Sequence, residues 1–454
     1  MPLFNRTLWL RRRKMDYTWV LVSMATFWLL CSISSIMFRT FAGSSPPIRT
    51  GHLVDWDGRV YVKSKNKTDF ARRGFYHYPF PRSDMCFFSR FLEAEGMPKL
   101  HSAFADPVSH NVIFIGTRFL ADNWTRETFV AHFENGQRRL CDPIVEDFFS
   151  FGYISQFNIV LTCPLPQFLH KRLNFSLNLQ RISNVKKYRR YAYDNLTICQ
   201  SGASKFQRYL LSACTMVRNM DHYLPEWIAF HRYVGVQHFF LYDNEPEETS
   251  KLRKTVRREI AEGVVTVIPW THIALGQKTY LEVQIAHEND CLWRNRYRTK
   301  WMIKIDVDEF VQPMNASKRK ITDYLEGPYF ETIGAARLQN WFFGRHDFDK
   351  SAGTTNNSII ERNTWRPSYP SPQNCGRDKN ILQPKYVHYF KIHAIKVGGE
   401  AVSLNPHDEL RLVHYRQDNS RVRHFDLPPF TTQDVSMVKL IVKARKVFGN
   451  QTKG

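Results

Sequence analysis

The sequence predicts an α/β protein whose mixed sheet is preceded by a small β-rich domain and an N-terminal transmembrane helix. Three observations support this fold class. Residues 206–430 alternate apolar, strand-like runs with helix-length segments, residues 82–205 hold short apolar and aromatic runs broken by turn residues, and residues 17–38 carry no charge. With 454 residues, of which 43% are hydrophobic, the chain can bury a sizeable core. This composition excludes a wholly disordered or collagen-like protein.

The uncharged segment Tyr17–Phe38 is long enough to cross the ~30 Å hydrocarbon core of a bilayer as a helix. A cleaved signal peptide would have a shorter apolar region, of about 7 to 15 residues, and a better small-residue cleavage site, so an uncleaved signal anchor is favoured. Positive flanks stay in the cytoplasm, which places residues 1–16 there and the rest of the chain in the lumen. We therefore expect a single-pass type II protein of the Golgi membrane. The basic flank consists of Arg6, Arg11, Arg12, Arg13 and Lys14.

The chain carries 64 Lys and Arg against 42 Asp and Glu, a formal charge of +22. Its basic residues are scattered, without zinc-finger spacing or an RNA-recognition signature, and a lumenal domain meets no genome. Most of the charges are expected on a solvated surface, and the others can attract an anionic small molecule or an acidic polymer. A nucleic-acid partner is therefore not expected.

The chain divides by composition into six segments. After the tail and the anchor, residues 39–81 are polar and contain Pro and Gly, as in a stem. A β-rich accessory domain over residues 82–205 and the α/β domain over residues 206–430 follow, with a C-terminal tail over residues 431–454. Seven of the eight cysteines follow the anchor. Cys214 lies in an apolar strand-like run and is the expected unpaired, buried thiol, while the other six allow up to three disulfides in 15 connectivities.

Within the α/β domain, four strands and three helices are expected in alternation, which requires crossover connections and a mostly parallel sheet. Ligands of such sheets bind beyond the carboxyl ends of the strands. The expected strands are 210–217, 236–243, 264–270 and 301–307, and the expected helices are 221–233, capped by Asp221, 247–262, closed by Gly263, and 280–298. The polar residues at the strand ends are Arg218, Asn219, Asp243, Asn244, Thr271, His272, Asp306 and Asp308.

Three Asp-x-Asp triplets occur, at residues 55–57, 306–308 and 347–349. Only Asp306-Val-Asp308 directly follows a hydrophobic strand, where the two-residue period would send both side chains to one face. Two carboxylates roughly 6 to 7 Å apart suit a divalent cation that also binds diphosphate oxygens. A strand-end turn with solvated acids is the alternative.

Several motifs, in a fixed order over about residues 210–430, together resemble glycosyltransferase family 92, which includes plant β-1,4-galactan synthases and animal galactosyltransferases. Residues 158–164 faintly resemble the end of the β-rich module of the galactan synthases. The motifs are Cys214–Asn219, Glu226–His231, Gly235–Asn244, Asp290 with Cys291 and Arg294, Ile305–Phe310 with Pro313, Trp341–Gly344 and His414–Arg416.

The resemblance implies a GT-A nucleotide-sugar fold and transfer of a sugar, with inversion, from a UDP-sugar to a glycan or polysaccharide acceptor. UDP-galactose is the expected donor and Mn²⁺ the expected cofactor. The alternatives are a sugar-binding pseudoenzyme and a nucleotide-sugar phosphotransferase on a similar fold. The oligomeric state is left open, a homodimer included.

The resemblance also implies roles for the donor site. Asp308 would bind the metal, Asp306 the metal or the ribose, and Arg218 and Asp243 the uridine. A third metal ligand in such folds is a late histidine. His393 is preferred over His388 and His414 because it lies in a strand-like stretch after Lys379 and Pro384, which match the family pattern.

The diphosphate and the acceptor need further groups. His414 and Arg416 would contact the diphosphate, since an Arg fork fits phosphate oxygens. Inverting transfer requires a base for the acceptor hydroxyl. The loop after Trp341 follows the strand expected to face the acceptor, which makes Asp347 the leading candidate, with His346 and Asp349 as alternatives.

Overall fold

A computed structural model describes about two thirds of the chain, nearly all of it in the compact unit Val54–Gly454. No helix among the described residues is long and apolar enough to cross a membrane. The expected anchor, residues 17–38, lies outside them. The described residues are 52–54, 60–62, 88, 91–119, 128–145, 156–182, 191–201, 207–272, 277–346, 358–373, 376–415 and 429–448.

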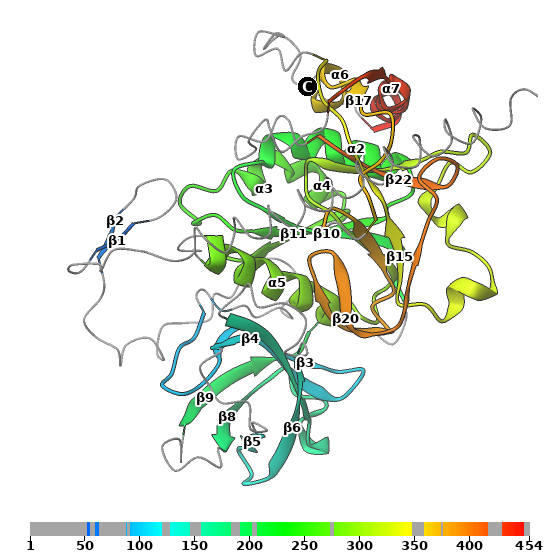
Figure 1. Ribbon diagram of the computed structural model, residues 1–454. Helices are drawn as coiled ribbons and strands as arrows, with labels where there is room; N and C mark the ends of the chain where they lie inside the picture. The colour runs from blue at the N-terminus through cyan, green and yellow to red at the C-terminus, as the bar shows by residue number, and fades with distance from the viewer. Residues whose placement is uncertain are drawn as a thin grey trace, which may run out of the picture. The chain divides into compact units, whose positions relative to one another are not determined.

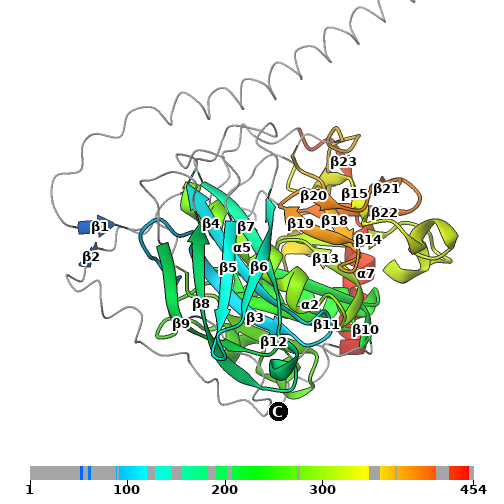
Figure 2. The same ribbon diagram turned by 90° about the horizontal axis from the view of Figure 1, so that it is seen from below.

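The segment expected to be β-rich forms a seven-stranded antiparallel sheet in the order β3-β4-β7-β6-β5-β8-β9 (Figures 1 and 2). In β5 and β8 alternate residues are buried, and in β8 Phe175, Leu177 and Leu179 point into one core. A disulfide between Cys141 and Cys163 joins β6 to β7. The strands are β3 (Lys99–Asp106), β4 (Asn111–Phe119), β5 (Thr128–Phe133), β6 (Arg138–Val145), β7 (Gln156–Pro164), β8 (Asn174–Ile182) and β9 (Tyr191–Cys199), after the short β1 (His52–Val54) and β2 (Val60–Val62), with a 3₁₀ turn at Gln167–Leu169.

A second seven-stranded sheet has the order β12-β11-β10-β13-β18-β15-β21. Its first four strands are parallel, as the alternation of strands and helices predicts. The other three make the sheet mixed, because β18 runs antiparallel to both β13 and β15 while β21 runs parallel to β15. The strands are β10 (Tyr209–Val217), β11 (His238–Asp243), β12 (Val265–Pro269), β13 (Thr299–Lys304), β15 (Ala335–Leu338), β18 (Lys379–Leu382) and β21 (Ala401–Ser403).

The three expected helices are present with different ends. The first begins as a 3₁₀ turn, and Asp221 accepts a hydrogen bond from Thr255 Oγ1 at 2.9 Å instead of capping the helix. The second is split into two short helices that end before Gly263, whose φ of 70° suits glycine. The helices are α2 (Leu224–Tyr233), α3 (Leu252–Thr255), α4 (Arg257–Ala261) and α5 (Gln277–Arg294).

A small sheet of order β14-β22-β16 flanks the mixed sheet and pairs distant segments. Its antiparallel register places Glu309 opposite His414, and its parallel register places Phe342 opposite His414. The remaining elements are β14 (Glu309–Pro313), β16 (Asn340–Phe342), β17 (Trp365–Arg366), β19 (Val387–Lys391), β20 (Ala394–Gly398), β22 (Leu410–His414), β23 (Thr432–Gln433), α6 (Ile359–Arg362), α7 (Ser436–Phe448) and 3₁₀ turns at Asp221–Tyr223, Ile321–Tyr324 and Pro328–Glu331.

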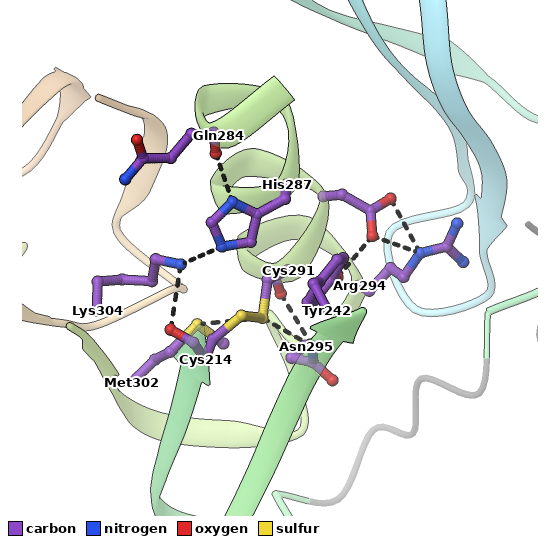
Figure 3. The surroundings of a disulfide bond; sticks show 10 residues. Cys214, Tyr242, Gln284, His287, Cys291, Arg294, Asn295, Met302 and Lys304 are labelled. Atoms are coloured by element: carbon purple, nitrogen blue, oxygen red, sulfur yellow. Dashed lines mark hydrogen bonds and ion pairs between the residues drawn. A yellow bond between two sulfur atoms is a disulfide. The ribbon is translucent and has the colours of Figure 1, made fainter. Parts of the chain in front are cut away.

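The expectation that Cys214 is an unpaired thiol is wrong, because Cys214 on β10 forms a disulfide with Cys291 on α5 (Figure 3). Both residues are fully buried. The apolar surroundings that suggested a free thiol are the packed face between the sheet and α5, where the helix brings Cys291 to the strand. Cys199 is disulfide-bonded too.

Residues expected to form a C-terminal tail contain α7, which packs against α2. Met437, Ile441 and Ala444 of α7 are buried in the core of the mixed sheet. Arg445 forms salt bridges of 2.9 Å with Glu226 on α2 and Glu361 on α6. The core of the α/β domain therefore continues to Phe448, beyond the expected boundary at residue 430.

Ile441→Val should lower the free energy of unfolding by about 1 kcal/mol, because it removes one buried methylene from a packed site. Urea denaturation of the two proteins measures the difference. Val442→Ala is the matched control, since Val442 is 40% exposed on the outer face of the same helix. Its effect should stay within about 0.5 kcal/mol. Equal losses at both positions would contradict the packing of α7 described here.

Candidate functional site

The carboxyl ends of β10, β11 and β12 bring polar residues together at one edge of the mixed sheet. Val217 and Asp243 pair in register, so the residues that follow them are neighbours. The backbone N–H of Asn219, which has a φ of 56°, donates to Glu245 Oε1 at 2.5 Å. Asn244 Nδ2 donates to the carbonyls of Trp270 and His272 at 2.7 and 3.1 Å. These contacts fix the ends of three strands as one polar edge.

Among the residues of this edge that are expected to bind the nucleotide, Asp243 has a carboxylate that is held by hydrogen bonds. Its Oδ2 accepts from Ser250 Oγ at 2.6 Å and its Oδ1 from the Glu245 N–H at 3.3 Å. Burial raises the pKa of Asp243 to about 6, against the hydrogen bonds from Ser250 and the Glu245 N–H, which favour the charged form. Arg218, half-buried, follows the end of β10 at the same edge. Each Asp243 oxygen keeps a lone pair for another donor.

The acidic triplet lies in the turn between β13 and β14, because β13 ends at Lys304. The expectation that one strand end sends both carboxylates to the same surroundings is therefore wrong. The Asp306 side chain is 46% exposed, and its Oδ2 lies 2.7 Å from Lys379 Nζ. The Asp308 side chain is only 6% exposed, and its Oδ2 lies 3.8 Å from His414 Nε2. The turn thus gives the two carboxylates different partners.

Three neighbours orient His414. Its Nδ1 lies 3.1 Å from Asn340 Oδ1, and since an amide oxygen only accepts, Nδ1 must carry the proton. Nε2 lies on the side of the ring that faces Asp308. Glu309 Oε1 lies 3.5 Å from Nδ1 and is buried without a hydrogen-bond partner. The Tyr415 N–H donates to the Asp308 carbonyl at 2.9 Å, which ties the two strands together beside the pair.

Asp308 and His414 fit a divalent cation. Two ligands that each lie about 2.1 Å from one ion are roughly 3 to 4 Å apart, and the Oδ2–Nε2 separation of 3.8 Å falls in this range. Within the described part of the chain, no three His, Cys, Asp or Glu side chains gather to hold a metal by themselves. Substrate oxygens and water are the usual further ligands of hard cations bound to phosphates.

The preference for His393 over His414 as a metal ligand has no support in this geometry. His393 lies between β19 and β20, and its Nδ1 donates to the Asp378 carbonyl at 2.7 Å. Burial, with the nearby Lys379, lowers the pKa of His393 to about 3. His414 instead faces Asp308. His414 is placed beside Asp308 by the pairing of β14 with β22. These strands are about a hundred residues apart in sequence, so no local sequence pattern indicates the contact.

Two buried charged residues, Lys304 and Glu288, lie near the triplet. Lys304 at the end of β13 has its Nζ 3.2 Å from the Cys214 carbonyl and 3.0 Å from His287 Nε2 (Figure 3). Burial lowers the pKa of Lys304, and burial raises the pKa of the nearby Glu288. Glu288 Oε2 also accepts from the Ile392 N–H at 2.8 Å. Helix α5 therefore anchors both the end of β13 and the turn after β19.

Sequence reasoning gave no role to Lys379, Glu309 and Asn340, although Glu309 directly follows the triplet and Lys379 matches the family pattern. Three candidates, Asp347, Asp349 and Arg416, lie outside the described residues. His346 is described, and its ring lies 4.4 Å from that of Trp365.

Comparisons with known proteins find relatives that are named as glycosyltransferases. A glycosyltransferase family 92 protein of Ricinus communis is 34% identical over 104 residues, or 23% of this chain and 16% of that protein. A galactan β-1,4-galactosyltransferase of Arabidopsis thaliana is 27% identical, over 47% of this chain and 41% of its own. A β-1,4-galactosyltransferase of Caenorhabditis elegans is 23% identical, over 77% of this chain and 79% of its own. The chain thus spans only a small part of the Ricinus relative.

Among solved structures, a mannosyltransferase of Pyrobaculum calidifontis in complex with GDP-mannose and Mn²⁺ superposes with a TM-score of 0.28 and 15% identity, over 48% of this chain and 61% of that one. The model of glycosyltransferase family 92 matches residues 207–447, which is more than half of the chain. The matched range includes all but the last residue of α7 and every strand of the mixed sheet. The chain therefore belongs to glycosyltransferase family 92.

Proposed function

We propose that the protein is an inverting, metal-dependent galactosyltransferase with a GT-A fold, which moves galactose from UDP-galactose to a glycan or polysaccharide. Family membership and two relatives named as β-1,4-galactosyltransferases support the reaction class. The observation that carries the proposal is the convergence of Asp308 and His414 at the carboxyl edge of the sheet. This is the position at which α/β sheets bind their ligands.

In this proposal the donor lies along the polar edge. Asp243 and Arg218 bind the uridine, Asp306 the ribose and Arg416 the diphosphate, while Asp308 and His414 hold Mn²⁺. The cation, when bound, neutralises the charge that develops on the departing diphosphate. Asn340 and Glu309 keep the His414 ring oriented toward the ion.

Transfer then needs one displacement. The acceptor hydroxyl oxygen bonds to the anomeric carbon on the face opposite UDP, the bond to the diphosphate oxygen breaks, and Asp347 takes the hydroxyl proton. One displacement inverts the configuration at this carbon. His346 and Asp349 are the alternative bases.

We also propose that the chain is anchored in the Golgi membrane through residues 17–38, with the catalytic domain in the lumen. The disulfides Cys141–Cys163 and Cys214–Cys291 support an oxidising compartment. Protease treatment of sealed vesicles tests the orientation. Digestion of the C-terminal domain without detergent would rule it out.

The activity is tested by incubating the full chain with Mn²⁺, a panel of UDP-sugars and glycan acceptors. Turnover should be greatest with UDP-galactose, and the product should contain a new glycosidic bond of inverted configuration. A phosphodiester product would identify a phosphotransferase. Tight UDP binding without turnover across the panel would favour a sugar-binding pseudoenzyme.

UDP affinity should fall as the pH drops below about 6, because the Asp243 carboxylate, whose pKa is about 6, is the form that accepts a hydrogen bond from the uracil N–H. Above this pH the carboxylate is present and affinity should be constant. Calorimetry with UDP and Mn²⁺ between pH 5 and about 8 measures the profile. Asp243→Asn should bind UDP more weakly and lose the part of this dependence that exceeds what the terminal phosphate of UDP, whose second pKa is about 6, contributes in both proteins. An unchanged profile in that variant would remove Asp243 from the uridine site.

A further inference from the structure

Lys379 is a buried lysine at the start of β18, directly beside the acidic triplet. It is 4% exposed, and its Nζ lies 2.7 Å from Asp306 Oδ2 and 3.4 Å from Glu309 Oε2. Burial alone would lower the pKa of Lys379, but the Asp306 and Glu309 carboxylates outweigh it and raise the pKa above its usual value. A buried ammonium group persists only with such partners. Lys379 is therefore a fixed positive charge of the site.

The contact between Lys379 and Asp306 gives the two aspartates of the triplet different partners. Lys379 holds Asp306 Oδ2, and the Asp306 N–H donates to Glu309 Oε2 at 2.8 Å, so side chain and backbone of Asp306 are both fixed. Asp308 Oδ2 instead faces His414 Nε2. A carboxylate two residues from a metal ligand would ordinarily be free to bind the same cation.

We propose that Lys379 is a positioning residue that keeps Asp306 out of the metal's coordination shell and leaves its carboxylate for the nucleotide. This inference rests on the proposed function. It has an electrostatic consequence: a dication held by one carboxylate and a neutral imidazole keeps a net charge of about +1, whereas a second carboxylate would cancel it. The retained charge is what offsets the leaving diphosphate.

Lys379→Met tests the proposal with a readout that a purely structural role would not move. Without the ammonium group, Asp306 can reach the cation, so Mn²⁺ should bind the nucleotide-free protein at least about tenfold more tightly. UDP should bind at least about tenfold more weakly in saturating Mn²⁺, because Asp306 no longer faces it. The EPR signal of free Mn²⁺ measures the first quantity and calorimetry the second.

Asp306→Asn is the matched variant, since it breaks the same ion pair from the other side. It should leave Mn²⁺ affinity within about twofold of the original while weakening UDP binding. In the double variant Lys379→Met/Asp306→Asn, the gain in Mn²⁺ affinity should disappear. The proposal is overturned if Lys379→Met binds Mn²⁺ no more tightly, or if the double variant retains the whole gain.

Folding is checked by circular dichroism. If Lys379→Met does not fold, Asp306→Asn decides, because a tenfold or greater loss of Mn²⁺ affinity in that variant would make Asp306 a metal ligand and the proposal wrong. An original protein that binds Mn²⁺ and UDP but transfers no sugar would refute the proposed enzyme while leaving this inference intact. An original protein that binds no Mn²⁺ would refute both.

Discussion

Asp308→Asn should lower the rate of sugar transfer by at least about a hundredfold, because it keeps the size of the side chain but removes the charge that holds the cation. His414 Nε2 alone, 3.8 Å away, cannot replace it. Initial rates measured against Mn²⁺ concentration check this. Stability should change little or rise. Burial is the main reason that the pKa of Glu309 is raised, but the Asp306 and Asp308 charges add to it, so losing the Asp308 charge relieves repulsion between carboxylates.

The control for this variant is Asp349→Asn, which changes a carboxylate of another Asp-x-Asp triplet and should leave transfer nearly unaffected if Asp347 is the base. Asp347→Asn should abolish transfer but spare metal-dependent UDP binding if Asp347 is the base. A folded Asp308→Asn protein that transfers sugar at the normal rate without added divalent cation would falsify the metal assignment.

Removing the Cys214–Cys291 disulfide should lower the free energy of unfolding by about 2 to 4 kcal/mol. The bridge joins residues 77 apart in sequence, and a longer closed loop restricts the unfolded chain more. Both sulfurs are also buried between β10 and α5. Urea denaturation of Cys214→Ala/Cys291→Ala under non-reducing conditions measures the loss.

Cys141→Ala/Cys163→Ala is the matched comparison, because that bridge closes a separation of only 22 residues. Loop-closure entropy predicts that its removal costs about 1 kcal/mol less. A larger loss at Cys141–Cys163, or none at Cys214–Cys291, would contradict this explanation.

Local patterns predicted the parallel half of the mixed sheet. Strands such as β11 and β13 are short runs with apolar centres between helix-length segments, and helix-linked crossovers favour parallel neighbouring strands. The same reasoning placed Arg218 and Asp243 at one edge, where the register of β10 and β11 puts them. These features depend only on residues near one another in sequence.

Features that depend on distant pairing were not predictable in this way. β18 enters the sheet beside β13 from some eighty residues downstream, and it carries Lys379 to Asp306. β22 likewise brings His414 to Asp308, which no local periodicity indicates. Cys214 was misjudged because an apolar run looks the same whether its cysteine is free or faces another on a packed helix.

Helix α5 packs against the accessory sheet, which limits how far the two parts of the chain can be separated. Its Arg294 is 3% exposed, forms a 2.9 Å salt bridge with Asp290, and donates to Ser102 Oγ on β3 at 2.8 Å. Phe104 lies under the same guanidinium and shares one apolar cluster with residues of α5. A chain shortened to residues 207–454 would leave this ion pair and cluster uncovered. The accessory sheet therefore cannot simply be exchanged for another domain. A protein that combined residues 207–454 with a different domain would need other residues to bury this face of α5.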